Sequence, residues 1–302
     1  MLQLLMILIA LIIGHRCGRL PISQDILNKF LNISVLMILL VMGYDFGCKT
    51  SDITSEAFLL FKQVATFTIL LFLFNFTSVY LFSRSRFNRL RSEYHMKEKY
   101  PNYFSYVFTS CKYLVYVIGG IILGHYIKWN LIYLDSIISF MLFIMLFIIG
   151  HQLNQQGVSL KNIITNKLGI IISIIIIISS LLAGMLSAKI LKIDMKVGVM
   201  LSSGFGWYTL SGILSGQLVN HHIGTASFFI DFVREIIAIL LFPVFGRKYP
   251  IPLIGYSGAT ALDFTLPIIK VHIGDEGIPV AVTSGMILTV LVPILMPLLL
   301  MF

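Results

Sequence analysis

The chain has 302 residues, of which 58% are hydrophobic and 12% charged, and its mean hydropathy is +0.94. This composition is typical of polytopic membrane proteins and leaves no stretch for a sizeable soluble domain. The formal net charge of +9 does not indicate a nucleic-acid partner, because no basic helix or aromatic–basic patch accompanies it. The three cysteines lack metal-ligand spacing, so neither a metal nor a cofactor is predicted.

Eight segments along the chain are apolar and long enough to cross a bilayer. They lie at 2–20, 30–47, 57–82, 104–127, 131–150, 168–190, 224–245 and 278–300. Two further apolar segments, 198–217 and 255–271, are interrupted by Gly, Ser, Pro and charged residues. We therefore predict an all-α polytopic membrane protein, with about eight transmembrane helices plus two broken or re-entrant segments.

Internal repeats predict how these segments are arranged within a single transmembrane domain, 1–302. In the first repeat, Gly14-His15 aligns with Gly124-His125, and Gly43 aligns with Gly150. The halves 1–103 and 104–197 each hold three spans, an odd number, so the second half is inverted relative to the first. The second repeat pairs 198–250 with 251–302, each a broken segment followed by a span. Its matches are Ser203-Gly204 with Ser257-Gly258, and Gly224 with Gly277.

The distribution of basic residues predicts the orientation. If both broken segments return to the side from which they entered, both termini lie outside. Cytoplasmic loops then carry thirteen Lys and Arg residues, six of them in 83–103, and outside loops carry five. This bias follows the positive-inside rule. If both broken segments instead cross the membrane, Arg247 and Lys248 move outside, which fits the rule less well.

Three charged residues lie near the middle of the span 224–245. At about 1.5 Å per residue this span is roughly 33 Å long, so Asp231, Arg234 and Glu235 lie near the bilayer midplane. Each such charge costs on the order of 2.5 to 3.5 kcal/mol and needs a partner or a function. Their spacing places all three on one sector of the helix, where Arg234 neutralises only part of the acidic charge. A structural pair of Asp231 with Arg234 would leave Glu235 as the functional acid.

The first broken segment carries the motif Ser203-Gly204-Phe205-Gly206-Trp207-Tyr208. Its glycines allow the backbone to leave helical geometry, which is tolerated at membrane depth only inside protein or along an aqueous cavity. Freed carbonyls can then bind a cation, and the Trp207 or Tyr208 ring can cover an ammonium group. Alternatively, both rings are ordinary interfacial residues.

The second broken segment places Thr260 and Asp263 between apolar residues and is closed by Pro267. This pattern predicts a second broken helix that faces the first, whereas Asp263 as a simple helix cap is the alternative. Asp45 follows the repeated glycine of the second span and is a further candidate, although its place near a span end also suits a structural role. No nucleophile or phosphate-binding motif is present, so we expect no enzyme.

The motifs SGFGWYTLSGIL (203–214), DFVREIIAILLFP (231–243) and GATALDFTLP (258–267) resemble those of the LysO-type bacterial lysine exporters. The resemblance runs along the whole chain but depends on these three motifs. It implies L-lysine as substrate, with toxic lysine analogues, and a location in the bacterial inner membrane. It also implies that the two acids associated with transport correspond to Glu235 and Asp263.

The chemistry of these residues agrees with a secondary transporter of a cationic amino acid. Lysine carries two ammonium groups and one carboxylate, which suit two acids together with Arg234 or a helix amino end. Proton antiport is the expected coupling, and sodium is the alternative. There are two competing hypotheses. The chain could be an importer of a charged small metabolite on an inverted-repeat fold, or it could be an intramembrane acid–base enzyme. Lipids are the surrounding partners, and the oligomeric state is left open.

Overall fold

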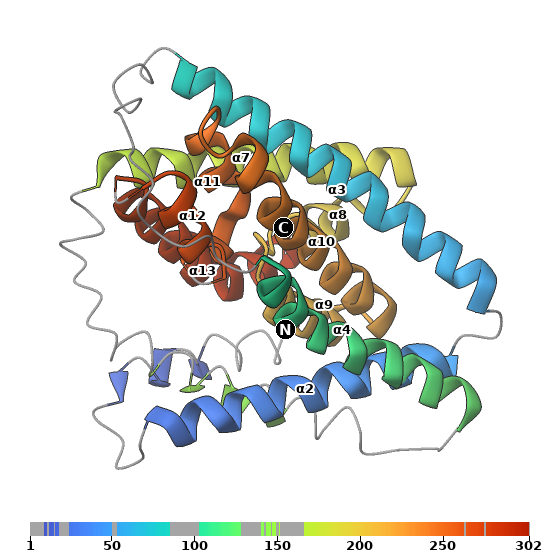
Figure 1. The fold of residues 1–302 in the computed structure, drawn as a ribbon. Coiled ribbons are helices and arrows are strands. Elements are labelled where there is room, and N and C mark those ends of the chain that lie inside the picture. Colours follow the sequence, from blue (N-terminus) through green and yellow to red (C-terminus); the bar gives the residue numbers. More distant parts are fainter. Residues whose placement is uncertain are drawn as a thin grey trace.

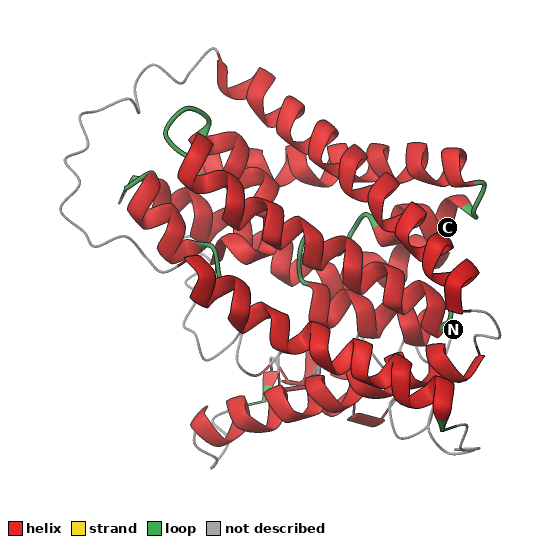
Figure 2. Ribbon diagram, turned by 45° about the vertical axis from the view of Figure 1, so that its right-hand side comes forward, coloured by secondary structure: helices red, strands yellow, loops and turns green. Residues whose placement is uncertain are grey.

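The computed structural model describes most of the chain from residue 24 onward and a few shorter pieces. Its residues are 9–10, 12–14, 16–17, 24–49, 53–84, 103–127, 140–141, 143–145, 147–148, 151, 166–262, 264–274 and 276–301. Within these ranges the regular structure is helical and no strand is present (Figure 2). The all-α prediction is therefore confirmed at this level.

Six long helices occupy predicted spans. They are α2 (Gln24–Lys49), α3 (Ile53–Arg84), α4 (Tyr103–Tyr126), α7 (Lys167–Leu191), α10 (His221–Phe245) and α13 (Gly277–Met301) (Figure 1). By length and composition, α7, α13 and the part of α3 from Glu56 to Arg84 qualify as membrane spans. The predicted spans 2–20 and 131–150 fall largely outside the described residues.

Contacts between α3, α7 and α10 define the two ends of the helix bundle. At one end, His222 Nδ1 at the start of α10 lies 3.4 Å from Glu56 Oε2 near the start of α3. At the other end, the rings of Tyr249 and Tyr80 pack 5.6 Å apart. The α7 helix runs antiparallel to both, since its Ser179 Oγ donates to Asn75 Oδ1 at 2.6 Å and its early residues meet late α3. Hereafter, the first end is end A and the second is end B.

The first broken segment forms hairpin 1, residues 195–218. Helix α8 (Met195–Leu201) begins at end A, where Asp194 caps it, and runs back along α7 so that Gly198 faces Ala188. After a break at 202–207, helix α9 (Tyr208–Leu218) returns along α10, with Gly216 against Gly224. Both outer ends of hairpin 1 therefore lie at end A, and its tip lies deep in the bundle.

The second broken segment forms hairpin 2, residues 250–272, which enters from end B. Helix α11 (Pro250–Ser257) is followed by the 3-10 turn η2 (Gly258–Leu262) and helix α12 (Leu266–His272). A Cβ on Gly246, at the end of α10, would lie 3.1 Å from His272 Cβ, so α12 returns to end B. The segment begins earlier than the expected residue 255, because Pro250 and Pro252 open α11, where their missing N–H groups cost little.

Helices α2 and α4 pack on each other through a glycine seam, formed by Gly43, Gly47, Gly120 and Gly124. A Cβ on Gly120 would lie 2.1 Å from the Leu40 carbonyl oxygen, and one on Gly124 would lie 2.0 Å from the Tyr44 oxygen. Such approach is possible only without side chains, as in small-residue packing of membrane helices. Residue numbers rise together along the seam, so α2 and α4 run in the same direction.

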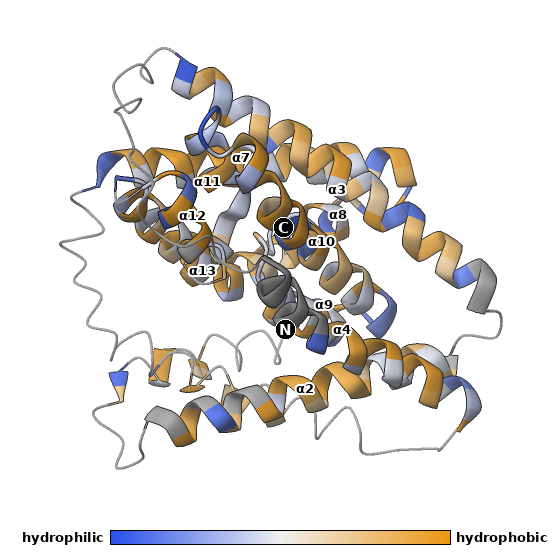
Figure 3. Ribbon diagram, in the orientation of Figure 1, coloured by the Kyte–Doolittle hydropathy of each residue, from blue (hydrophilic) through white to orange (hydrophobic). Residues whose placement is uncertain are grey.

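The outer surface of the bundle is apolar, as expected for a lipid environment. Along α3, Phe58 and Phe61 are each 70% exposed and Leu81 is 67% exposed. The hydropathy colouring shows apolar residues along the flanks of α2, α3 and α7 (Figure 3). In a protein surrounded by water, so many exposed large apolar side chains would promote association. Polar residues are instead enriched inside, around the hairpin tips.

Candidate functional site

The tip of hairpin 1 is held to α10 by Asp231. The Gly206 N–H donates to Asp231 Oδ1 at 2.8 Å, and the Ser211 hydroxyl donates to Oδ2 at 2.5 Å. Asp231 is fully buried, so these donors replace the water that a carboxylate would otherwise require. The break between α8 and α9 thus supplies a backbone N–H and a serine hydroxyl to a charge in the middle of α10.

Gly204 provides the space that this carboxylate occupies. A Cβ at residue 204 would come within 1.8 Å of Asp231 Oδ2 and 2.7 Å of Ser211 Cβ. The next residues leave helical geometry, with φ of +50° at Phe205 and +91° at Gly206. A non-glycine residue with positive φ is uncommon, and such backbone is associated with functional sites.

Arg234 makes the corresponding contact with hairpin 2. Its Nε donates to the Tyr256 carbonyl oxygen at 2.8 Å, and its Cζ lies 5.3 Å from the centre of the Tyr256 ring. A Cβ on Gly258, whose φ is +66°, would lie 3.1 Å from Arg234 Nη2. One turn of α10 therefore contacts both tips, hairpin 1 through Asp231 and hairpin 2 through Arg234.

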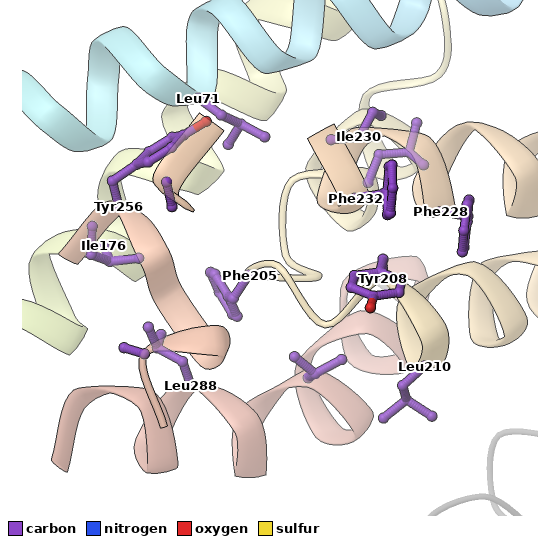
Figure 4. Close-up of a cluster of buried hydrophobic side chains, with 14 of the residues drawn as sticks. Leu71, Ile176, Phe205, Tyr208, Leu210, Phe228, Ile230, Phe232, Tyr256 and Leu288 are labelled. Atoms are coloured by element: carbon purple, nitrogen blue, oxygen red, sulfur yellow. The ribbon is translucent and has the colours of Figure 1, made fainter. Parts of the chain in front are cut away.

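The two tips also contact each other directly. The Ala259 N–H donates to the Phe205 carbonyl oxygen at 2.8 Å. The same oxygen lies 2.2 Å from the position of a Cβ on Gly258, so a side chain there would separate the tips. Phe205 lies between two groups of buried side chains, one around Tyr256 and one around Tyr208 and Phe232 (Figure 4). Two hairpins from opposite ends thus meet beside a charged turn.

Such opposed broken helices at mid-depth are a common arrangement of ion and substrate sites in secondary transporters. The sequence profile of the family described as "Lysine exporter LysO" matches residues 114–300. The lysine exporter LysO of Escherichia coli strain K12 is 33% identical over 296 residues, which cover 97% of each chain. The chain belongs to the lysine exporter LysO family.

A second relative of this LysO-family chain comes from Haemophilus influenzae. This protein, named a putative lysine exporter, is 39% identical over 180 residues, which are 60% of the present chain and 92% of the relative. No solved structure matches the chain. The family resemblance predicted from the three late motifs is therefore confirmed, and the relatives are named as exporters rather than enzymes.

Of the two acids that the resemblance implied for transport, the structure describes Glu235 but not Asp263. Glu235 is fully buried and follows Arg234 on α10, one turn beyond Asp231. Asp263 lies outside the described residues and follows η2 in the sequence. The proposed pairing of Glu235 with Asp263 in one cavity stays a prediction. Asp45 falls within α2, near the glycine seam, and its side chain is outside the description.

Asp231 and Arg234 share no hydrogen bond in the described part of the chain, although their opposite charges attract each other. Their hydrogen bonds go to different hairpins, so the structural pair suggested by their spacing stays a prediction. Sequence spacing placed them on one sector of α10, but it carries no information on whether a neighbouring tip supplies a better-placed partner. The backbone N–H of Gly206 and the carbonyl of Tyr256 supply those partners here.

The remaining candidates surround the tips. Trp207 precedes α9 and is partly buried, whereas Tyr208 is 3% exposed and packs edge-on against Phe228 and Phe232. Tyr208 is therefore an interior aromatic residue, not part of an interfacial belt. Ser203 donates to the Met200 carbonyl oxygen at 2.7 Å and Thr260 donates to that of Ser257 at 2.9 Å, so both hydroxyls stabilise the tips.

Three contributors were assigned no role from sequence. Ser211 was visible only as part of the glycine-rich motif, and its bond to Asp231 joins residues 20 positions apart. Tyr256 acts through its carbonyl oxygen, which every residue type carries. A polar residue inside an apolar span was the available signal for Asn75, whose Oδ1 accepts hydrogen bonds from Ser179 and Ser180 of α7 at 2.6 and 3.1 Å.

Proposed function

We propose that this chain exports L-lysine, together with toxic lysine analogues, across the bacterial inner membrane as a secondary active transporter. The observation that carries the proposal is the fully buried Asp231–Arg234–Glu235 turn of α10, which lies where the two hairpin tips meet. Buried charges of both signs at this position suit a zwitterionic solute with an extra positive charge. Relatives named as lysine exporters support lysine as that solute.

Proton antiport is the coupling that we propose. Lysine leaves the cell as a cation, and moving one positive charge outward against an inside-negative potential costs about 2.3 kcal/mol per 100 mV. Glu235 and Asp263 are carboxylates that bind either an ammonium group or a proton. Alternating occupancy of these groups would make lysine exit depend on proton entry, without any ATP-binding motif in the chain.

The proposed orientation has both termini and end A outside, and residues 83–103 in the cytoplasm. The parallel packing of α2 and α4 supports this, because the two helices begin on the same side and the sequence before each of them is basic. Arg84, Lys167, Arg247 and Lys248 all lie next to helix termini at end B. The sequence segment 83–103, which begins at the end of α3 and holds six Lys and Arg residues, adds the excess that makes end B the cytoplasmic end under the positive-inside rule.

The test is lysine efflux from proteoliposomes that contain the purified full-length chain. Vesicles preloaded with labelled lysine receive an imposed pH gradient, a sodium gradient, or neither, at matched membrane potential. We expect efflux to accelerate only when protons can enter the lysine-containing compartment. If the sodium gradient accelerates efflux instead, sodium and not the proton is the coupling ion. Absence of both efflux and lysine counterflow would contradict lysine transport and favour an enzyme or another substrate.

A further inference from the structure

We propose that Arg234 is the subsite for the substrate's α-carboxylate, a role that rests on the lysine transport proposed above. The inference assigns one chemical group of the substrate to one side chain. It also predicts which compounds the site rejects: diamines and amino-acid amides, which keep the ammonium groups but lack the carboxylate.

The first argument is the incomplete hydrogen bonding of the guanidinium. An arginine side chain has five N–H donors in a planar fork. Arg234 uses Nε on the Tyr256 carbonyl oxygen, whereas Nη1 and Nη2 have no acceptor among the described residues. The side chain is 0% exposed, so bulk water does not satisfy these donors. Unsatisfied buried donors on a charged group are costly, and they indicate that an acceptor binds there during function.

The second argument is the shape of the surroundings. Gly258 lies beside Nη2, and Gly206 lies beside the aliphatic part of the side chain, where a Cβ would be 3.9 Å from Arg234 Cδ. Tyr256 covers the guanidinium with its ring at 5.3 Å. The fork is thus held by a carbonyl and an aromatic face and is bordered by the glycines of both tips. A ligand bound to Nη1 and Nη2 would contact both hairpins.

The third argument is the distribution of negative charge. Asp231, the acid closest in sequence on the amino-terminal side, already accepts hydrogen bonds from Gly206 and Ser211. It attracts Arg234 from a distance but does not occupy its Nη groups. A carboxylate is the preferred bidentate partner of an arginine fork, and lysine has one such group.

Ligand discrimination by purified full-length protein tests this assignment. Competition against labelled lysine compares L-lysine, L-lysinamide and 1,5-diaminopentane on the wild type and on Arg234→Gln, Arg234→Lys and Arg247→Gln. Arg247 is exposed at end B and serves as the matched arginine control. We expect wild-type protein to prefer lysine over both carboxylate-free compounds. Arg234→Gln should weaken lysine binding about 10- to 100-fold, as expected for losing hydrogen bonds to a charge. Diaminopentane binding should change little.

The outcomes separate this inference from the proposed function. If wild-type protein binds lysine and lysinamide equally, the carboxylate is not recognised and the Arg234 assignment is wrong, whatever the variants do. If Arg234→Gln weakens the binding of lysine and of diaminopentane alike, Arg234 has a structural role. Its partner could then be an acid outside the described residues. Should Arg234→Gln fail to fold, Arg234→Lys keeps the charge without the fork and should still lose the preference for lysine. If wild-type protein binds no lysine, the proposed function itself fails.

Discussion

Glu235 and Asp263 are the residues whose carboxylates the proposed proton exchange requires. Glu235→Gln and Asp263→Asn keep the side-chain shape but cannot titrate. We expect both to lose proton-coupled lysine efflux in proteoliposomes while still reaching the membrane. Glu276→Gln, an exposed acid beside the start of α13, is the matched control and should transport normally. Efflux at the wild-type rate from either site variant would contradict the proton-exchange mechanism.

Asp231 contributes to stability through two hydrogen bonds from hairpin 1, in which Gly206 and Ser211 are the donors. Asp231→Ala would leave the Gly206 N–H and the Ser211 hydroxyl without their acceptor, at a cost of about 2–3 kcal/mol. Asp231→Asn should lose much less, because its oxygen still accepts from Gly206 and its amide donates to the Ser211 oxygen. Thermal unfolding in detergent measures the difference.

Ser227→Ala, a buried serine one turn earlier on α10, is the control for Asp231 and should change stability little. Equal destabilisation by Asp231→Asn and Asp231→Ala would show that the negative charge, through its attraction to Arg234, is what matters. That result would support the structural pair that the sequence spacing suggested.

At the scale of elements, two neighbouring glycines of α4 differ in the space that the packing against α2 leaves for a side chain. A Cβ on Gly120 would lie 2.1 Å from the Leu40 carbonyl oxygen, whereas one on Gly119 would have no atom within 4 Å. Gly120→Ala should therefore force the helices apart and lower the unfolding temperature and the yield of folded protein. Gly119→Ala should be neutral or stabilising by about 0.5–1 kcal/mol, because alanine favours the helix. Similar behaviour of the two variants would contradict this packing.

The helices were predictable from sequence to the extent that bilayer thickness sets their length. The expected spans 57–82 and 168–190 differ from α3 and α7 by a few residues, since an apolar run has to match the hydrocarbon core. The breaks were predictable too, because the sequence places glycines in both apolar segments. Two of them, Gly206 and Gly258, adopt the positive φ that other residues disfavour. The partners of Asp231 and Arg234 were not, because a backbone N–H or carbonyl group has no sequence signature and the contacts join separate elements.

At the scale of the whole molecule, the two hairpins enter from opposite ends and their tips meet through the hydrogen bond from the Ala259 N–H to the Phe205 carbonyl oxygen. A substrate bound to Arg234 would therefore contact elements that reach the surface at different ends. This arrangement suits alternating access, in which movement of one hairpin opens the site to one side only.

Cysteine accessibility tests whether the hairpins re-enter or cross the membrane. In a background with Cys17, Cys48 and Cys111 replaced by serine, single cysteines replace Val219, which is 37% exposed before α10, or the exposed Lys248 after it. If both hairpins return to the ends from which they entered, an impermeant thiol reagent added outside intact cells labels residue 219 but not residue 248. If both broken segments cross, the pattern reverses, because the direction of α10 reverses. Cysteines at 95 and 302 serve as references in either case, with 302 labelled from outside and 95 protected. If residue 248 is labelled and residue 219 is protected while the two references behave as expected, the hairpin arrangement is wrong. The two broken segments would then cross the membrane instead of returning to the ends from which they entered.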